Sequence, residues 1–160
     1  MTLAACSSTP DSYRIETDLS GRKVLVGKLT RAALEGDTTF TWFQAGYRRY
    51  QPDSASMAAL KPKAKDLRFV LFLGTWCSDS KAEVPKMFKV FDQLAIGPGQ
   101  IELYGLDHLK KADSDVPERY GVTKVPTLIV YDGSNEAGRI VEQPRESVEE
   151  DLRLMLGHRP

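Results

Sequence analysis

The segment 67–73 (Leu-Arg-Phe-Val-Leu-Phe-Leu) is a nearly continuous apolar run. Such a run is typical of a strand buried on both faces, which lies near the centre of an α/β sheet. Gly74 to Cys77 then indicates a turn, and apolar residues at helical spacing predict a helix over about 78–94. We therefore expect the fold to be organised around this strand and the helix that follows it.

Downstream of this pair, strands and helices alternate. Strand-like runs occupy 101–106, 127–131 and 138–142, and helices are predicted near 117–121 and over 144–156. Strands interleaved with helices call for a parallel core, and the turn Asp132-Gly133 makes the last two strands a hairpin. The order from residue 67 onward is therefore β-α-β-α-β-β-α, an α/β fold.

Residues 13–60 have a different pattern, and we expect them to be mostly helical. A short strand is predicted over 24–29, followed by three helical stretches that begin near Thr30, Asp37 and Asp53. The second stretch carries an aromatic face, which we expect to pack on the rest of the fold. The sequence thus predicts an N-terminal extension over 13–60 and a main domain over 61–160.

Length and charge exclude several classes of protein. The chain has 160 residues, which is the size of one domain. Its 22 basic and 22 acidic residues leave no positive excess for a nucleic acid, so we expect no nucleic-acid partner. No apolar run reaches the roughly 20 residues that a membrane helix needs. Two cysteines and two histidines argue against a disulfide scaffold and against zinc clusters, so we expect neither metal nor cofactor.

The N-terminus carries a second feature. Leu3-Ala4-Ala5-Cys6 resembles a bacterial lipobox, and the Ser/Thr/Pro stretch after it resembles a lipoprotein tether. A signal peptide has a charged start and 7–15 apolar residues, whereas five residues precede Cys6 here. Two interpretations stay open for residues 1–12. They are a truncated lipoprotein signal, with lipidated Cys6 anchoring the chain in the cell envelope, or a disordered tail on a cytoplasmic protein.

Cys77 is the candidate nucleophile. It lies between the central strand and its helix, where the helix dipole and the free N–H groups of the first turn favour a negatively charged sulfur. Ser80 follows one turn later, and its hydroxyl can donate a hydrogen bond to that sulfur. Asp79 either opposes the negative charge or simply stabilises the start of the helix.

These residues resemble a known family. Trp76-Cys77-Ser78-Asp79-Ser80 resembles the Trp-Cys-x-x-Cys motif of thioredoxins, and Pro85 has the family's spacing from the cysteine. The segment 120–127 resembles the family's Tyr-Gly-Val-x-x-x-Pro-Thr. The resemblance implies a thioredoxin-like fold, a central mixed sheet flanked by helices, with the mostly helical extension added. It also implies a cis Val125–Pro126 bond that lies against the active cysteine.

The departures from the family motif bear on function. Ser80 stands where thioredoxins have their second cysteine. Leu71 and Leu103 stand at the positions of a buried carboxylate and a lysine. The chain resembles a little-characterised bacterial group that shares Gly-Thr-Trp-Cys-x-Asp-Ser. The resemblance therefore implies a nucleophile and a groove without the resolving thiol or the buried proton relay.

The first functional hypothesis is a monothiol enzyme of thiol–disulfide oxidoreductase or isomerase type that serves cell redox homeostasis. Cys77 would be catalytic with Ser80 beside it, and Trp76, Asp79, Val125 and Pro126 would form the substrate groove. The partners would be protein disulfides or low-molecular-weight thiols. A substrate thiol, a small thiol such as glutathione or a partner protein would resolve the mixed disulfide.

Two alternatives stay open. The second hypothesis is a non-catalytic peptide-binding or chaperone-like module, in which the Val125 backbone pairs with an extended peptide. The third is metal delivery or peroxide reduction, for which His108 could approach the site and Thr75 precedes the cysteine by two residues. The sequence predicts no particular oligomeric state.

Overall fold

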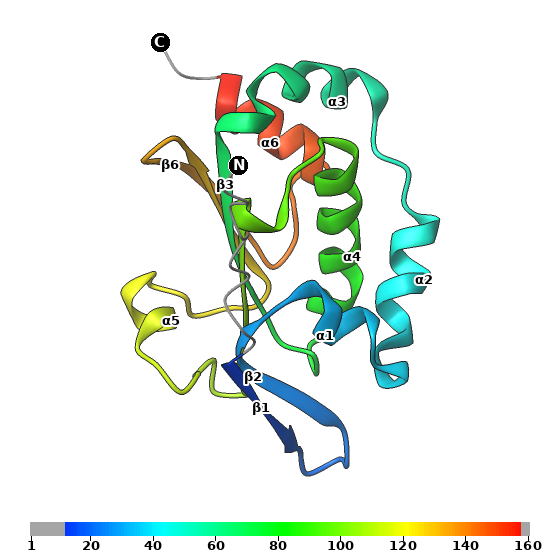
Figure 1. Cartoon of the computed structure of the whole chain (residues 1–160), viewed down its shortest axis with the longest axis vertical. Coiled ribbons are helices and arrows are strands. Elements are labelled where there is room, and N and C mark those ends of the chain that lie inside the picture. Colours follow the sequence, from blue (N-terminus) through cyan, green and yellow to red (C-terminus); the bar gives the residue numbers. More distant parts are fainter. Residues whose placement is uncertain (1–11, 158–160) are drawn as a thin grey trace, which may run out of the picture.

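A computed structural model describes residues 12–157 and contains one six-stranded mixed sheet (Figure 1). The strand order is β1-β2-β4-β3-β5-β6. The strands are β1 (Ser12–Thr17), β2 (Lys23–Leu29), β3 (Leu67–Leu73), β4 (Ile101–Gly105), β5 (Thr127–Asp132) and β6 (Asn135–Val141). Cys6 and nearly all of the predicted tail lie outside the described residues.

The apolar run forms β3, as predicted, and it occupies an interior position of the sheet. It pairs in parallel with β4 and antiparallel with β5, and β5 and β6 form the expected hairpin. Every residue of β3 except Arg68 is buried, because helices cover both faces of the sheet at this strand. The α/β class and the expected central mixed sheet flanked by helices are confirmed.

Helices lie on the two faces unequally (Figure 1). The helices α1, α2, α3, α4 and α6 all contribute to the larger hydrophobic core, while α5 packs over the other face with a smaller apolar cluster. The helices are α1 (Arg31–Glu35), α2 (Thr41–Arg49), α3 (Ser54–Leu60), α4 (Ser78–Gln93), α5 (Val116–Arg119) and α6 (Val148–Gly157), with short 3-10 turns η1 (Thr38–Phe40), η2 (Lys61–Asp66) and η3 (Pro98–Gln100).

The N-terminal region contains the expected helices over about half of residues 13–60, and it also contributes two strands to the sheet. β2 was predicted, whereas β1 was not. β1 forms because 12–17 (Ser-Tyr-Arg-Ile-Glu-Thr) alternates apolar and polar residues and runs into a turn closed by Asp18. β2 then pairs antiparallel with β4, so this hairpin widens the sheet beyond the strands predicted after residue 67.

Two elements begin three or more residues from the predicted start. α6 begins at Val148 rather than at Pro144, because the Asp151 carboxylate accepts hydrogen bonds from the Arg145 and Glu146 amides at 2.8 and 3.2 Å. This holds the preceding residues in a capping turn instead of a helical one. β6 begins at Asn135, three residues before the predicted start. None of the helices described here is long and apolar enough to cross a bilayer.

Candidate functional site

Cys77 is the N-cap residue of α4, with extended backbone angles (φ −83°, ψ 128°). Its position follows directly from the sequence, since β3 ends at Leu73 and α4 starts at Ser78. Cys77 is half-buried, and its Sγ lies 3.4 Å from the Val125 carbonyl oxygen, to which the thiol donates a hydrogen bond. The sulfur therefore sits at a helix start, in contact with the loop that precedes β5.

The loop opposite the sulfur is held in place from several sides. The Val125–Pro126 peptide bond is cis, and both residues are buried. The Glu142 amide donates to the Pro126 carbonyl at 2.7 Å, and the Thr127 hydroxyl donates to the Lys124 carbonyl at 2.7 Å. Within the described part of the chain, the Val125 N–H has no hydrogen-bond partner. A buried loop therefore presents one carbonyl to the thiol and leaves one amide free.

Ser80 is not placed as the sequence predicted. Its side chain is fully buried, and its Oγ accepts a hydrogen bond from the Gly74 amide at 3.1 Å. Among the described residues it makes no hydrogen bond with the Cys77 sulfur. Because helical geometry turns Ser80 toward the end of β3, the hydroxyl closes the turn that carries Cys77 rather than contacting the thiol.

Asp79 is half-buried, and its side chain bonds to a residue outside the predicted groove. Its Oδ1 accepts a hydrogen bond from Gln143 Nε2 at 3.0 Å, which links the first turn of α4 to the segment between β6 and α6. The carboxylate also lies at the positive end of the α4 dipole, where a negative charge stabilises the helix. Gln143 is a contact that sequence reasoning missed, since nothing in the pattern marks a partner 64 residues away.

Trp76 is held by its neighbours on three sides. Its Nε1 donates to the Leu106 carbonyl at 2.9 Å, which fixes the plane of the indole. A Cβ at Gly74 would lie 2.7 Å from the indole Cε2, so the glycine is required for the ring to lie against the backbone. On its other side the ring stacks on His108, with centroids 4.3 Å apart, and Lys110 Nζ lies 5.6 Å from the centroid.

His108 reaches the site through Trp76, not through the sulfur. Its Nε2 lies 3.2 Å from Asp18 Oδ2, in the turn between β1 and β2. Hydrogen bonds to Asp18, above all from the Arg22 amide, and then from the Ser20 amide and the side chains of Arg22 and His108, lower the pKa of that carboxyl to about 2. A charged carboxylate therefore anchors the imidazole that covers the Trp76 ring.

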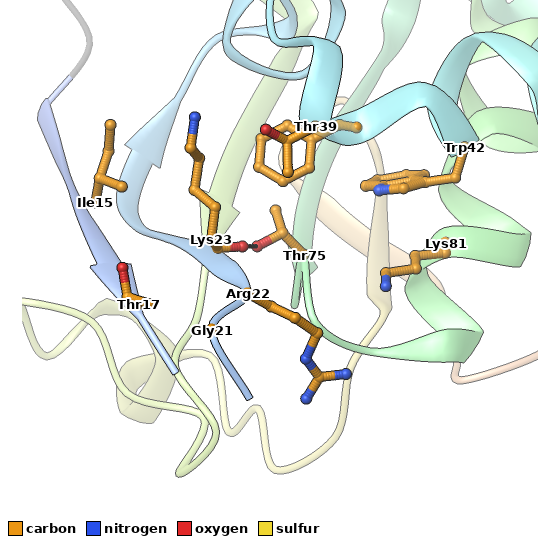
Figure 2. A pocket seen from close by; sticks show the side chains of 10 residues that line it. Ile15, Thr17, Gly21, Arg22, Lys23, Thr39, Trp42, Thr75 and Lys81 are labelled. Atoms are coloured by element: carbon orange, nitrogen blue, oxygen red, sulfur yellow. Dashed lines mark hydrogen bonds between the residues drawn. The ribbon is translucent and has the colours of Figure 1, made fainter. Parts of the chain in front are cut away.

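Thr75 connects the site to the N-terminal hairpin. It is buried, its Oγ1 accepts from the Leu25 amide at 3.2 Å, and it donates to the Lys23 carbonyl at 3.3 Å (Figure 2). The Thr75 hydroxyl thus makes both of its hydrogen bonds to β2, and it makes none to the thiol among the described residues. This arrangement gives no support to the peroxide hypothesis. No group of three His, Cys, Asp or Glu residues in 12–157 could hold a metal ion.

The two leucines that depart from the family motif are neighbours in the sheet. Leu71 of β3 pairs in register with Leu103 of β4, and their exposed fractions are 0% and 3%. The positions at which the resemblance implied a carboxylate and a lysine are therefore part of the hydrophobic core. The structure places no charged group at either position.

The chain is similar to known proteins over the region that carries Cys77. A family model described as Thioredoxin matches residues 55–153, more than half of the chain. A thioredoxin from Echinococcus granulosus is 36% identical over 70 residues, which cover 44% of this chain and 60% of that protein. The chain thus aligns with less than two thirds of this relative's length.

Two solved structures share the fold. A protein of unknown function from Pseudomonas aeruginosa has a TM-score of 0.53 at 19% identity, with 82% of this chain and 81% of that chain covered. An HIV epitope-scaffold has a TM-score of 0.52 at 20% identity, with 81% and 84% covered. At these identities the likeness concerns the fold alone.

Proposed function

The chain belongs to the thioredoxin family, and from this membership we propose that it catalyses thiol–disulfide exchange with Cys77 as its nucleophile. The family match supports a thiol–disulfide oxidoreductase-like function. The observation that carries the finer proposal is the placement of Cys77: a half-buried cysteine at the start of α4, with its sulfur 3.4 Å from the Val125 carbonyl. A sulfur in this position can be reached by a substrate disulfide.

The proposed reaction has two exchange steps. The Cys77 thiolate attacks one sulfur of a substrate disulfide, forms a mixed disulfide and releases the other sulfur as a thiolate, which takes up a proton. A second thiol then attacks the mixed disulfide, loses its proton and releases Cys77. Ser80 supplies no sulfur for this step, and its hydroxyl is buried on the Gly74 amide. The resolving thiol therefore comes from the substrate, a small thiol or a partner protein.

Turnover of a peptide–glutathione mixed disulfide, with glutathione as the reductant, tests this proposal. We expect Cys77→Ser to lose all turnover above the uncatalysed rate, with Ser80→Ala changing only the rate. Mass spectrometry of wild-type protein quenched by acid should show a glutathione adduct on Cys77. Turnover that survives in Cys77→Ser, in a protein whose circular dichroism matches wild type, would overturn the proposal.

One observation favours a second function, peptide binding without redox turnover. The Val125 N–H has no partner among the described residues, and Val125 packs against the partly buried Trp76 and Cys77. A free backbone amide can pair with the backbone of an added peptide strand. Titration of Cys77→Ser with a cysteine-free extended peptide should shift the Val125 amide resonance saturably. A resonance that does not move would exclude this binding mode.

The location proposed for the protein rests on sequence alone. Lipidation of Cys6 would anchor the chain in the bacterial envelope, facing the periplasm. Intact-mass measurement of protein extracted from bacterial membranes with detergent tests this. A diacylglycerol adduct on Cys6 would support the anchor, whereas unmodified protein in the soluble fraction would refute it and favour the cytoplasm.

A further inference from the structure

A hollow separate from the Cys77 sulfur lies between the β1–β2 hairpin, α2 and the first turns of α4 (Figure 2). Its volume is about 440 Å³. Small-molecule sites in proteins span roughly 300–1,000 Å³. The hollow is therefore large enough for a small organic ligand, and the exchange reaction proposed above makes no use of it.

The charges around the hollow do not balance. Of its three cations, Arg22 pairs with Asp18 at 2.8 Å and Lys23 pairs with Asp37 at 2.5 Å. Lys81, on α4, is half-buried, and its Nζ has no hydrogen bond or ion pair within residues 12–157. Partial burial of an unpaired ammonium is unfavourable. The hollow thus presents one uncompensated positive charge.

An aromatic surface lies next to that charge. Figure 2 shows Trp42 and Lys81 reaching toward the same space from α2 and α4. The indole is half-buried and is held by edge contacts with Phe40 and Phe43, each with centroids 6.1 Å apart. Its Nε1–H has no partner among the described residues. A packed ring of this kind offers a fixed flat surface for another ring, since aromatic pairs contribute about 0.5–1.5 kcal/mol beyond the area that they bury.

We propose that this hollow binds a small aromatic carboxylate, with the carboxylate on Lys81 Nζ and the ring against the Trp42 indole. The single unpaired cation selects a monoanion, because the other two cations of the hollow are already paired with Asp18 and Asp37 and would leave the second charge of a phosphate dianion unbalanced. The Trp42 surface selects a flat apolar body over a compact inorganic anion. The site does not depend on the chemistry proposed for Cys77.

The site borders the segment that carries Cys77. Thr75 lines the hollow, and the Lys81 amide donates to the Cys77 carbonyl at 3.0 Å. A ligand would therefore contact the residues on either side of the turn that holds the thiol. The test below reads binding at Trp42 directly, so that its result is separable from the outcome of the exchange assay.

The test is an NMR titration of the full ¹⁵N-labelled chain with benzoate, in which the two indole N–H resonances are monitored. The Trp76→Phe variant identifies the Trp42 signal. We expect benzoate to shift the Trp42 signal saturably, and neutral benzamide, acetate and inorganic phosphate each to bind at least about tenfold more weakly, a difference of about 1.4 kcal/mol. Benzamide removes the charge and acetate removes the ring.

Two lysine variants complete the design. Lys81→Met should weaken benzoate binding by about tenfold or more, which corresponds to about 1.4 kcal/mol. Lys89→Met, on the same helix but outside the hollow, should leave binding unchanged. The proposal is overturned if benzamide binds as tightly as benzoate, if Lys81→Met binds as wild type does, if phosphate binds more tightly than benzoate, or if the Trp42 signal does not saturate.

Discussion

Thr75→Val tests whether one buried hydroxyl ties the Cys77 turn to the N-terminal hairpin. β4 pairs with β2 only through residues 27–29, so the Leu25 amide lies beyond the end of that ladder. The Thr75 hydroxyl takes the place of the missing strand, accepting from Leu25 at 3.2 Å and donating to Lys23 at 3.3 Å. Valine has almost the same shape but no hydroxyl, so the substitution removes both hydrogen bonds without creating a cavity.

The expected cost follows from what is left behind. Leu25 is 2% exposed, and its amide would lose its partner in a place that water reaches poorly. A buried donor without a partner costs about 1–3 kcal/mol. For a chain of this size that corresponds to a fall of about 2–12 °C in Tm. Urea unfolding followed by circular dichroism measures the free energy, and hydrogen exchange of the Leu25 amide locates the effect.

Thr75→Ser is the matched control, since it keeps the hydroxyl and loses only a methyl group. We expect protection of the Leu25 amide to survive in Thr75→Ser and to fall in Thr75→Val. Surface substitutions usually change the free energy of unfolding by less than about 0.5 kcal/mol. If Thr75→Val also stays within that range of wild type and the Leu25 amide stays protected, then the hydroxyl does not hold the two segments together.

Three further predictions concern single contacts. Gly74→Ala places a Cβ 2.7 Å from the neighbouring indole, so we expect a loss of about 1–3 kcal/mol in urea unfolding and a changed tryptophan emission spectrum. Tyr50→Phe removes the hydroxyl that donates to the buried Glu149 carboxylate at 2.7 Å, and should cost about 1–3 kcal/mol in the free energy of unfolding. Hydrogen bonds, above all from the Arg22 amide, lower the pKa of Asp18 to about 2. The charged Asp18 carboxylate therefore stabilises the folded state fully above its usual pKa of 3.8, and this stabilisation is lost as the pH falls toward 2. In Asp18→Asn, the free energy of unfolding should depend less on pH between about 2 and 3.8.

Each of these predictions has a control in the same chain. Gly99→Ala, where a Cβ would meet nothing within 4 Å, should unfold as wild type does. Tyr47→Phe removes an exposed hydrogen bond to Asp92 and should cost less than about 1 kcal/mol. Equal costs for the two glycine variants, or for the two tyrosine variants, would contradict the packing described here. An unchanged pH dependence in Asp18→Asn would contradict the lowered pKa of Asp18.

Much of the fold could be predicted because its signals are local. The run over 67–73 predicted β3 from apolar composition alone, and Asp53 predicted the start of α3, where its carboxylate accepts from the Ser56 amide at 2.8 Å. β1 was missed because only a short alternation marks it and its sole strand partner is β2. The start of α6 was predicted too early because the Asp151 carboxylate accepts a hydrogen bond from the Arg145 amide, which lies six residues before it in the chain.

In the candidate site, too, some features could be predicted from the sequence and others could not. The position of Cys77 between a strand and a helix could be predicted, because chain order determines it. The hydrogen bond from Gly74 to Ser80 could not, because it depends on which way one hydroxyl turns once the helix has formed. The contact of His108 with Asp18 joins residues 90 positions apart and arises from how two loops meet in space. No periodicity or short motif carries information of that kind.

The likeness to the thioredoxin family begins at residue 55, yet the hydrophobic core begins earlier. Phe43 of α2 is fully buried against Phe88 of α4, with ring centroids 5.4 Å apart, and β2 covers the edge of β4. A fragment trimmed to the homologous stretch would present that aromatic surface and that strand edge to water, two features that promote aggregation. The part of this chain that matches the family model and the part that builds the hydrophobic core therefore have different boundaries, so the matched segment alone lacks part of the core.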